Sequence, residues 1–107
     1  MASLNSQALI AAGRQLGAPF EVQLKLAGEI QTARCVELLR LVPGRRVVVK
    51  LLLDEKTYLG KIFLGSEGEK YCQREKKGIK ALEGAGINTA QLEAHGCLED
   101  NGAEVLL

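Results

Sequence analysis

Lys61 and Glu75 are the two residues whose types and spacing best support chemistry in this chain. A strand period of two places Lys61 on one face with Leu59 and Phe63. Glu75 falls within the apolar arc of a helical stretch, 69–83, which is formed by Tyr71, Cys72, Ile79 and Leu82. A carboxylate among core residues is costly unless a cation meets it, so we predict a Lys61–Glu75 contact within salt-bridge distance. Such a pair can hold an ammonium group beside a bound phosphate; in the alternative, Lys61 extends into solvent and Glu75 lies at the helix border.

Other residue types that carry chemistry are few and scattered. Asp54 and Asp100 are the only aspartates, and both lie in turn-like sequences, so no catalytic aspartate is expected. His95 is the only histidine; it has no Ser or Cys partner in a recognisable arrangement and no Cys or acidic cluster at metal spacing, so no metal ligands are expected. Cys72 is expected to pack in the core. The second helix also carries three lysines that form either a solvated face or a membrane-surface patch: Lys76, Lys77 and Lys80.

The composition is that of one globular domain. Its 107 residues are 47% hydrophobic and 25% charged, with 14 Lys plus Arg against 13 Asp plus Glu. A net charge of +1 argues against nucleic acid as a partner. No apolar run approaches the roughly 18 residues of a membrane span, and the first residues lack the features of a secretory signal. The three cysteines are widely spaced, which fits a reducing interior, so we expect a cytoplasmic protein.

The periodicity predicts the elements that must position these residues. Helical spacing covers 5–16 and 69–83, and strand-like patterns cover 20–26, 30–42, 47–53, 57–64, 90–95 and 103–107. We therefore predict an α+β fold, an antiparallel meander sheet of about five strands with one long covering helix and a short N-terminal helix. Residues 1–19 would form an N-terminal helical extension to a domain over 20–107. Because the chain ends on an apolar stretch, 105–107, we expect the natural polypeptide to continue.

The order of the elements over 20–107 resembles the N-lobe of a protein-kinase-like fold. In that order, a strand carrying Leu59-Gly60-Lys61-Ile62 precedes a helix bearing Glu75, and two strands follow. Four stretches are similar to the bacterial lipopolysaccharide-core sugar kinases, which phosphorylate Kdo or heptose: 34–46, 74–82, Gly86-Ile87-Asn88-Thr89-Ala90 and Ala94-His95-Gly96. The order of these pieces supplies most of the specificity of the resemblance.

The resemblance implies a role for each matching residue. Lys61 would contact the α- and β-phosphates of ATP and Glu75 would orient Lys61, with Lys50 as the rival lysine. The loop that follows the first matching strand would cover the phosphates, or else form a solvated hairpin tip, through Gly44, Arg45 and Arg46. This loop lacks G-x-G-x-x-G, Leu59 stands where many kinases carry a small residue, and Ala90 replaces an expected proline.

The implied function is that of the ATP-binding N-lobe of a kinase-like phosphotransferase that acts on a lipopolysaccharide-core sugar, with ATP and magnesium serving the parent enzyme. The sequence has neither H-R-D-x-x-x-x-N nor D-F-G, so we expect no catalysis by this chain alone and a C-lobe as its partner. A peripheral location at the inner membrane and a dimer through the C-lobe-facing surface are further expectations. The alternatives are a lobe of a protein or small-molecule kinase, and a non-enzymatic α+β binding or interaction module.

Overall fold

The computed structural model describes residues 3–88, 92–100 and 102–107. In chain order its elements are α1 (Ser6–Ala12), a 3₁₀ turn (Gly13–Gln15), β1 (Phe20–Leu26), β2 (Glu29–Val42), β3 (Arg46–Leu53), β4 (Lys56–Phe63), α2 (Gly68–Gly84), β5 (His95–Leu98) and β6 (Glu104–Leu106). The four first strands and α2 lie within one residue of their predicted bounds. The strand predicted over 90–95 is displaced, since β5 begins at His95; residues 89–91 lie outside the described part of the chain.

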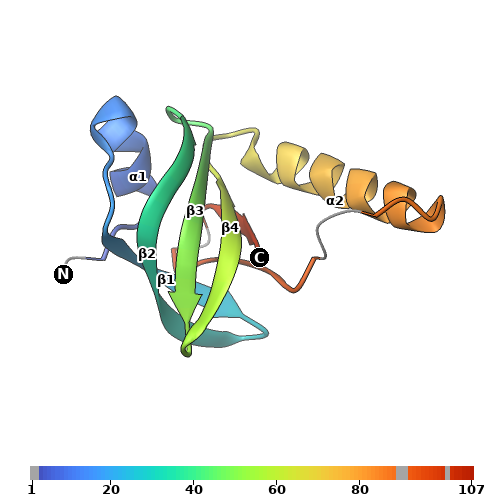
Figure 1. Ribbon diagram of the computed structural model, residues 1–107. Coiled ribbons are helices and arrows are strands. Elements are labelled where there is room, and N and C mark those ends of the chain that lie inside the picture. The colour runs from blue at the N-terminus through green and yellow to red at the C-terminus, as the bar shows by residue number, and fades with distance from the viewer. Residues whose placement is uncertain (1–2, 89–91, 101) are drawn as a thin grey trace.

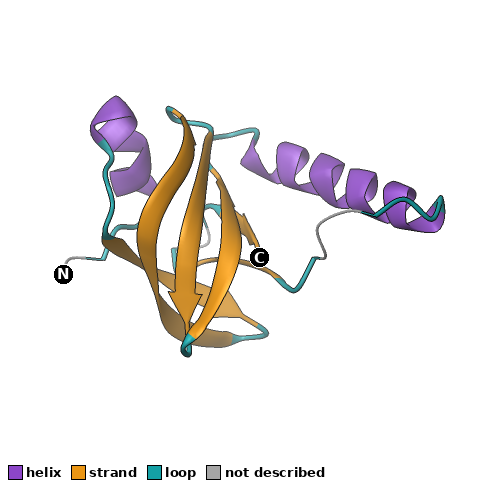
Figure 2. Ribbon diagram, in the orientation of Figure 1, coloured by secondary structure: helices purple, strands orange, loops and turns teal. Residues whose placement is uncertain are grey.

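The described strands form a closed barrel of six strands in the order β1-β2-β3-β4-β6-β5, and every pairing is antiparallel (Figure 1). The first four strands follow one another as a meander. Beyond them, β6 pairs with β4 and β5 pairs with β6. The barrel closes where β5 meets β1, with Leu24 opposite Leu98 and Lys25 opposite Cys97. Figure 2 shows the strands wrapping around a common axis, with both helices outside them.

The predicted fold class is therefore wrong. An open meander sheet of about five strands under one long covering helix was expected, whereas the sheet is closed and its core lies inside the barrel. The strand that makes the difference is β1, because it pairs with β2 along one edge and with β5 along the other. In the closed sheet each described strand has a neighbour on both sides, and side chains from all strands can then bury one another without a covering helix.

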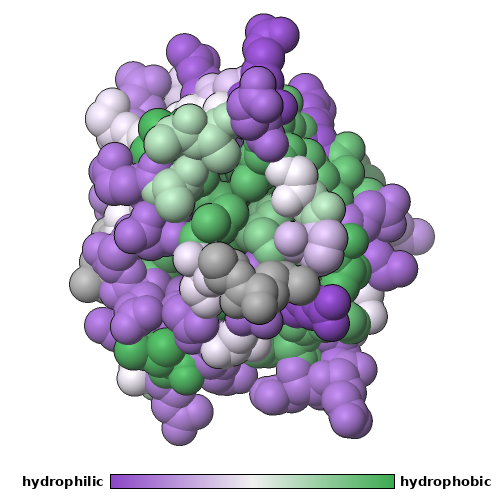
Figure 3. All heavy atoms as spheres, turned by 90° about the vertical axis from the view of Figure 1, so that its left-hand side faces the viewer, coloured by the Kyte–Doolittle hydropathy of each residue, from purple (hydrophilic) through white to green (hydrophobic). Residues whose placement is uncertain are grey.

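Alternation along the strands fills the barrel with apolar side chains. The inward positions of β1 and β3 are buried at 6% exposure or less: Phe20, Val22, Leu24, Val47, Val49, Leu51 and Leu53. Leu9 from α1 and Leu16 join the same core, so the described part of the N-terminal segment, residues 3–19, shares the core of the barrel. The face that carries α1 shows apolar atoms near its centre among hydrophilic side chains (Figure 3).

α2 lies on the opposite side of the barrel from α1, against the outer face of β4 and β6 (Figure 1). Its C-terminal half extends away from the barrel, and Leu82, which was predicted to face the sheet, is 40% exposed. Among the described residues, no helix combines the length and apolar character needed to cross a membrane. A small second core fixes the N-terminal half of α2 to the barrel, formed by Phe63, Cys72 and Leu106 with Tyr71 and Leu92 at its edge.

Candidate functional site

Lys61 and Glu75 form an ion pair between the outer face of β4 and α2, which confirms the contact predicted from the sequence. Lys61 points outward because its neighbours Gly60 and Ile62 are buried on the inner face. The two side chains are 29% and 23% exposed, so water reaches the pair only in part. The other carboxylate oxygen of Glu75, Oε2, is buried and has no hydrogen-bond partner within the described part of the chain. The pair therefore holds one acceptor that is not in use.

A pocket of about 250 Å³ opens beside this ion pair. Leu59 is 47% exposed, so its side chain is accessible at the pocket wall. The Lys61 ammonium group and the apolar side chains of the walls suit a flat apolar ring with an anionic tail. Lys56, Glu75 and Glu93 also line the pocket. The apolar walls come from β4, α2 and the C-terminal segment of the chain, and include Leu59, Ile79, Leu92 and Leu106.

The structure does not bring Gly44, Arg45 and Arg46 into this pocket. Gly44 and Arg45 lie in the turn between β2 and β3, and Arg46 is the first residue of β3. In this turn Gly44 takes a φ of 71° and the carbonyl of Arg45 accepts from the N–H of Leu64 at 2.7 Å. The Arg46 guanidinium carbon lies 5.6 Å from the centre of the Phe63 ring, within the range of a cation–π contact. Both arginines line another pocket, of about 150 Å³, together with Val42, Phe63 and Tyr71.

The rival lysine, Lys50, takes no part in the site. It is exposed on β3, opposite Glu37 and Leu59. Lys61 is the lysine that meets α2, because α2 rests on β4 and β6 rather than on β3. Lys50 is thus a suitable control for experiments on Lys61.

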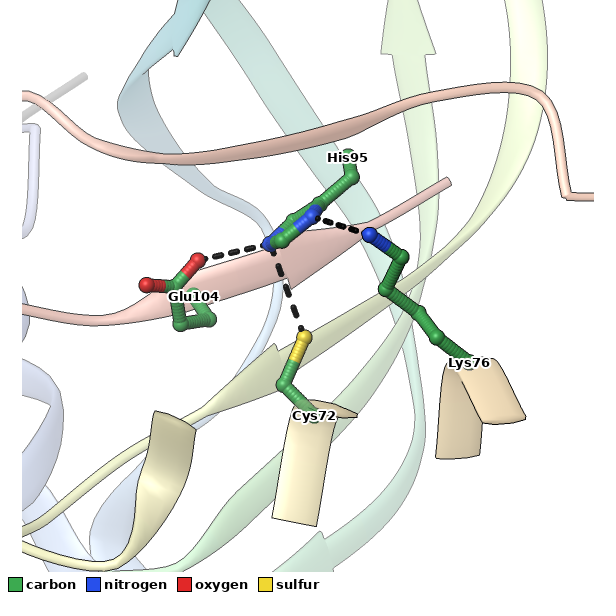
Figure 4. Close-up of polar contacts among 4 residues, drawn as sticks. All are labelled: Cys72, Lys76, His95 and Glu104. Carbon is green, nitrogen blue, oxygen red and sulfur yellow. Dashed lines mark hydrogen bonds and ion pairs between the residues drawn. The ribbon is translucent and has the colours of Figure 1, made fainter. Parts of the chain in front are cut away.

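A second polar cluster lies on the same outer face and joins three elements: Cys72 from α2, His95 from β5 and Glu104 from β6 (Figure 4). His95 Nε2 lies 2.7 Å from Glu104 Oε2 and 3.7 Å from Cys72 Sγ. Lys76 Nζ lies 3.0 Å from His95 Nδ1. An ammonium group can only donate, so Nδ1 is the acceptor here, and we assign the proton of the neutral imidazole to Nε2, facing Glu104.

The Cys72 thiol is not a nucleophile in this environment. Burial raises its pKa to about 11; the negative charge of Glu104 adds to the shift, and Lys76 opposes it. The thiol therefore stays protonated at neutral pH, and the thiolate is the reactive form of cysteine. Burial likewise raises the pKa of Cys35, inside the barrel, to about 12.

The sequence prediction missed this cluster. Cys72 is buried, as expected. No cysteine or acidic cluster at metal spacing was expected around His95, whereas in the folded chain Cys72 and Glu104 lie beside it. Cys72 lies 23 residues before His95, and no ligand-spacing motif spans such a separation. The pairing of β5 with β6 brings Glu104 to His95, and the docking of α2 brings Cys72.

Comparisons with protein-family models, curated proteins and solved structures found no match for this chain. The fold and the site define a small closed β-barrel with one helix docked on its outer face by an ion pair and a polar cluster. Its function is therefore argued from the geometry of that face.

Proposed function

We propose that this chain is the ATP-binding lobe of a kinase-like phosphotransferase, in which Lys61 binds the phosphates. The observation that carries the proposal is the Lys61–Glu75 ion pair at the wall of an apolar pocket. An ammonium group has three donors, and a single carboxylate oxygen contacts this one, so donors are left for phosphate oxygens. The apolar walls beside Leu59 and Leu106 suit the adenine ring.

Glu75 is the positioning residue in this proposal. It comes from α2 and holds the Lys61 ammonium at one point on the outer face of β4. Phosphoryl transfer depends on positioned charge more than on covalent chemistry by the protein, so the orientation of this amine matters. A helix that shifts away from the barrel would take Glu75 with it and leave Lys61 without its partner.

The remaining parts of the reaction belong to a proposed C-lobe, because this sequence has no catalytic loop and no D-F-G. That lobe would supply the base and the aspartate for the magnesium that accompanies ATP. The proposed acceptor is a hydroxyl group of a lipopolysaccharide-core sugar, which would place the enzyme in the cytoplasm at the inner membrane. A hydroxyl group of a protein or small molecule is the alternative acceptor.

One observation favours a second candidate, a binding module without a nucleotide site. Arg45 and Arg46 lie outside the pocket of Lys61, so two of the three cations that the sequence prediction assigned to the phosphates do not line it. The two lysines that do, Lys56 and Lys61, are matched there by two carboxylates, Glu75 and Glu93. A pocket lined by lysines and several leucines also suits an apolar carboxylic acid.

The test is a titration of the isotopically labelled chain with magnesium–ATP, followed by the amide resonances. We expect shifts at Leu59, Lys61 and Glu75 with a dissociation constant on the order of 1 mM. Lys61→Met should weaken binding about tenfold, because it removes charge-assisted hydrogen bonds to phosphate. Lys50→Met is the matched control and should leave the affinity unchanged.

Two results would contradict the proposal. If adenosine and an apolar carboxylate shift the same resonances as ATP and Lys61→Met does not discriminate among them, the pocket is that of the binding module. If magnesium–ATP shifts no resonance of the pocket at about ten times the expected dissociation constant, there is no nucleotide site on this chain.

A further inference from the structure

The cluster of Cys72, His95 and Glu104 contains three different metal-ligating groups on three elements that are remote in sequence. Their ligand atoms all lie within 4.8 Å of one another. Figure 4 shows the thiol and the carboxylate on either side of the imidazole edge, both directed toward Nε2. We propose that these three side chains bind one zinc ion, which fastens α2 to the β5–β6 hairpin.

The donor set is the first reason for zinc. Thiolate, imidazole and carboxylate are its usual protein ligands, whereas calcium and magnesium prefer oxygen alone. In a tetrahedral zinc site the bond lengths place ligand atoms about 3.3–3.7 Å apart. The Sγ–Nε2 distance of 3.7 Å already meets this spacing, and the 2.7 Å between Nε2 and Oε2 needs to widen by less than about 1 Å. A water molecule would take the fourth position.

The second reason is that hydrogen bonds satisfy both ring nitrogens of His95 and the carboxylate of Glu104 but give the Cys72 thiol only a contact at 3.7 Å. Nε2 of His95 carries either one hydrogen or one lone pair, yet it has a sulfur and a carboxylate oxygen as close neighbours. When the Nε2 proton points at Glu104, Nε2 has no lone pair with which to accept a hydrogen bond from the Cys72 thiol. A metal ion bound to the Nε2 lone pair would interact with all three groups at once.

Binding moves protons, and their balance can be written in full. Cys72 releases its thiol proton to solvent and ligates as the thiolate, while Glu104 ligates as the carboxylate. The His95 proton leaves Nε2 and a proton is taken up at Nδ1, so the imidazole stays neutral. One proton is released for each zinc ion, and no group is oxidised or reduced.

Lys76 competes with the metal in this scheme. Its ammonium donates to Nδ1 at 3.0 Å and so favours the tautomer that has a proton on Nε2, where zinc would bind. Zinc binding puts the proton on Nδ1, which then faces a second donor, and Lys76 must turn away into solvent. A side chain that can accept from Nδ1 should remove this conflict, so Lys76→Gln should bind zinc more tightly than the natural chain.

A zinc ion in this cluster would also affect the Lys61–Glu75 pair, because the two sites share α2. Cys72 lies three residues before Glu75, so both project from the same side of α2. A metal bond at Cys72 would hold the helix in the position where Glu75 meets Lys61. The metal site does not depend on the nucleotide proposal, because zinc binding is measured without any nucleotide.

The test uses the metal-free chain titrated with zinc against a chromophoric chelator. We expect one zinc ion per chain with a dissociation constant of about 1 μM or tighter. Cobalt as a substitute should give the near-ultraviolet charge-transfer absorption of a thiolate–cobalt bond, which identifies a cysteine ligand without any mutation.

Variants assign the ligands. His95→Gln and Cys72→Ser should each weaken zinc binding about 100-fold or more, since changes to outer partners alone cost 10–100-fold. Cys35→Ala is the control for loss of a buried thiol, and it should keep both the affinity and the cobalt absorption. Lys76→Gln should tighten binding about tenfold, whereas Lys77→Gln, an exposed neighbour on α2, should have no effect.

Three results would overturn the inference. The first is that the natural chain binds less than one zinc ion at micromolar concentration. The second is cobalt binding without the thiolate absorption. The third is a Cys72→Ser or His95→Gln variant that keeps the native circular dichroism spectrum and binds zinc as tightly as the natural chain.

Discussion

At the residue scale, the Lys61–Glu75 pair lies partly out of water, and one buried carboxylate oxygen of Glu75 has no hydrogen-bond partner among the residues that the structure describes. Removing one member of such a pair leaves the other charge without its partner, which costs more than the pair itself contributes. Replacing both members with apolar side chains removes this cost. The pair is therefore better explained as a device for positioning the amine than as a source of stability.

A double-mutant cycle tests this explanation. Lys61→Met should lower the free energy of unfolding by about 1–3 kcal/mol, because Glu75 then keeps a shielded charge without a cation. Adding Glu75→Leu should restore most of that loss, since apolar pairs often replace buried ion pairs without cost. Urea unfolding of the four chains measures the coupling, and purely additive effects would show that the two side chains do not interact in solution.

At the element scale, α1 is held in place by contacts with residues outside the helix. A helix of seven residues is too short to be stable in isolation. The side chain of Asn5, the residue just before the helix, caps its N-terminus. Asp100, in the β5–β6 turn, accepts from the Ser6 N–H at 2.8 Å and from the Ser6 hydroxyl at 2.7 Å. Leu9 then anchors the helix in the barrel core. One carboxylate thus links the N-terminal helix to the far end of the sequence.

The same contacts predict a pH dependence. Burial by itself would raise the pKa of Asp100, but hydrogen bonds from the Ser6 hydroxyl and from the N–H groups of Gly102 and Ser6 outweigh it and keep the pKa below the ordinary value of an aspartate. A pKa that is lowered on folding stabilises the protein above the unfolded-state pKa, and this contribution is lost as the pH falls through the folded-state value. Asp100→Asn should therefore lower the free energy of unfolding by about 1 kcal/mol at pH 7, and this difference should shrink below about pH 4.

Urea unfolding at several pH values gives the comparison. Asp54→Asn is the matched control, since it changes the other aspartate of the chain, which is exposed in the β3–β4 turn. It should stay within about 0.5 kcal/mol of the natural chain throughout. An Asp100→Asn difference that does not change with pH would mean that the carboxylate charge plays no part in holding α1.

At the scale of the whole molecule, the barrel depends on a short seam. Among the described residues, β1 and β5 share the two register pairs given above, and the Glu99 N–H extends the seam by donating to the Gln23 carbonyl at 2.8 Å. Few hydrogen bonds therefore close the sheet. Gly96 of β5 lies beside this seam, with its backbone close to β1. A Cβ at that position would lie 2.5 Å from the Lys25 carbonyl oxygen and would also collide with Leu26. The absence of a side chain at Gly96 is what lets the two strands approach.

Gly96→Ala should therefore open the seam and lower the free energy of unfolding by about 1–3 kcal/mol, as overpacking does elsewhere. Amide hydrogen exchange should become faster in β1 and β5 while β3 stays protected. Gly78→Ala is the control: a Cβ there meets nothing within 4 Å, and alanine should raise stability by about 1 kcal/mol in this helix interior. If Gly96→Ala keeps the protection of β1, closure of the barrel does not depend on that close approach.

The sequence by itself determined the local structure and one contact. Alternation in 20–26 and the change of period after residue 68 reflect which side of each element is buried, and such patterns are local. The Lys61–Glu75 contact could be predicted for the same reason, because a charged residue on each apolar face requires a partner and only one short connection separates strand from helix.

Only the tertiary structure decided the closure of the barrel and the second cluster. Alternation in β1 is the same whether its free edge faces water or pairs with β5, so the pattern cannot tell an open sheet from a closed one. Likewise, the second cluster forms because α2, β5 and β6 meet on one outer face, where they bring together Cys72, His95 and Glu104. The spacing of these residues in the sequence does not predict that contact. Periodicity reports which face of an element is buried, whereas pairing and docking between distant elements depend on the packing of the whole chain.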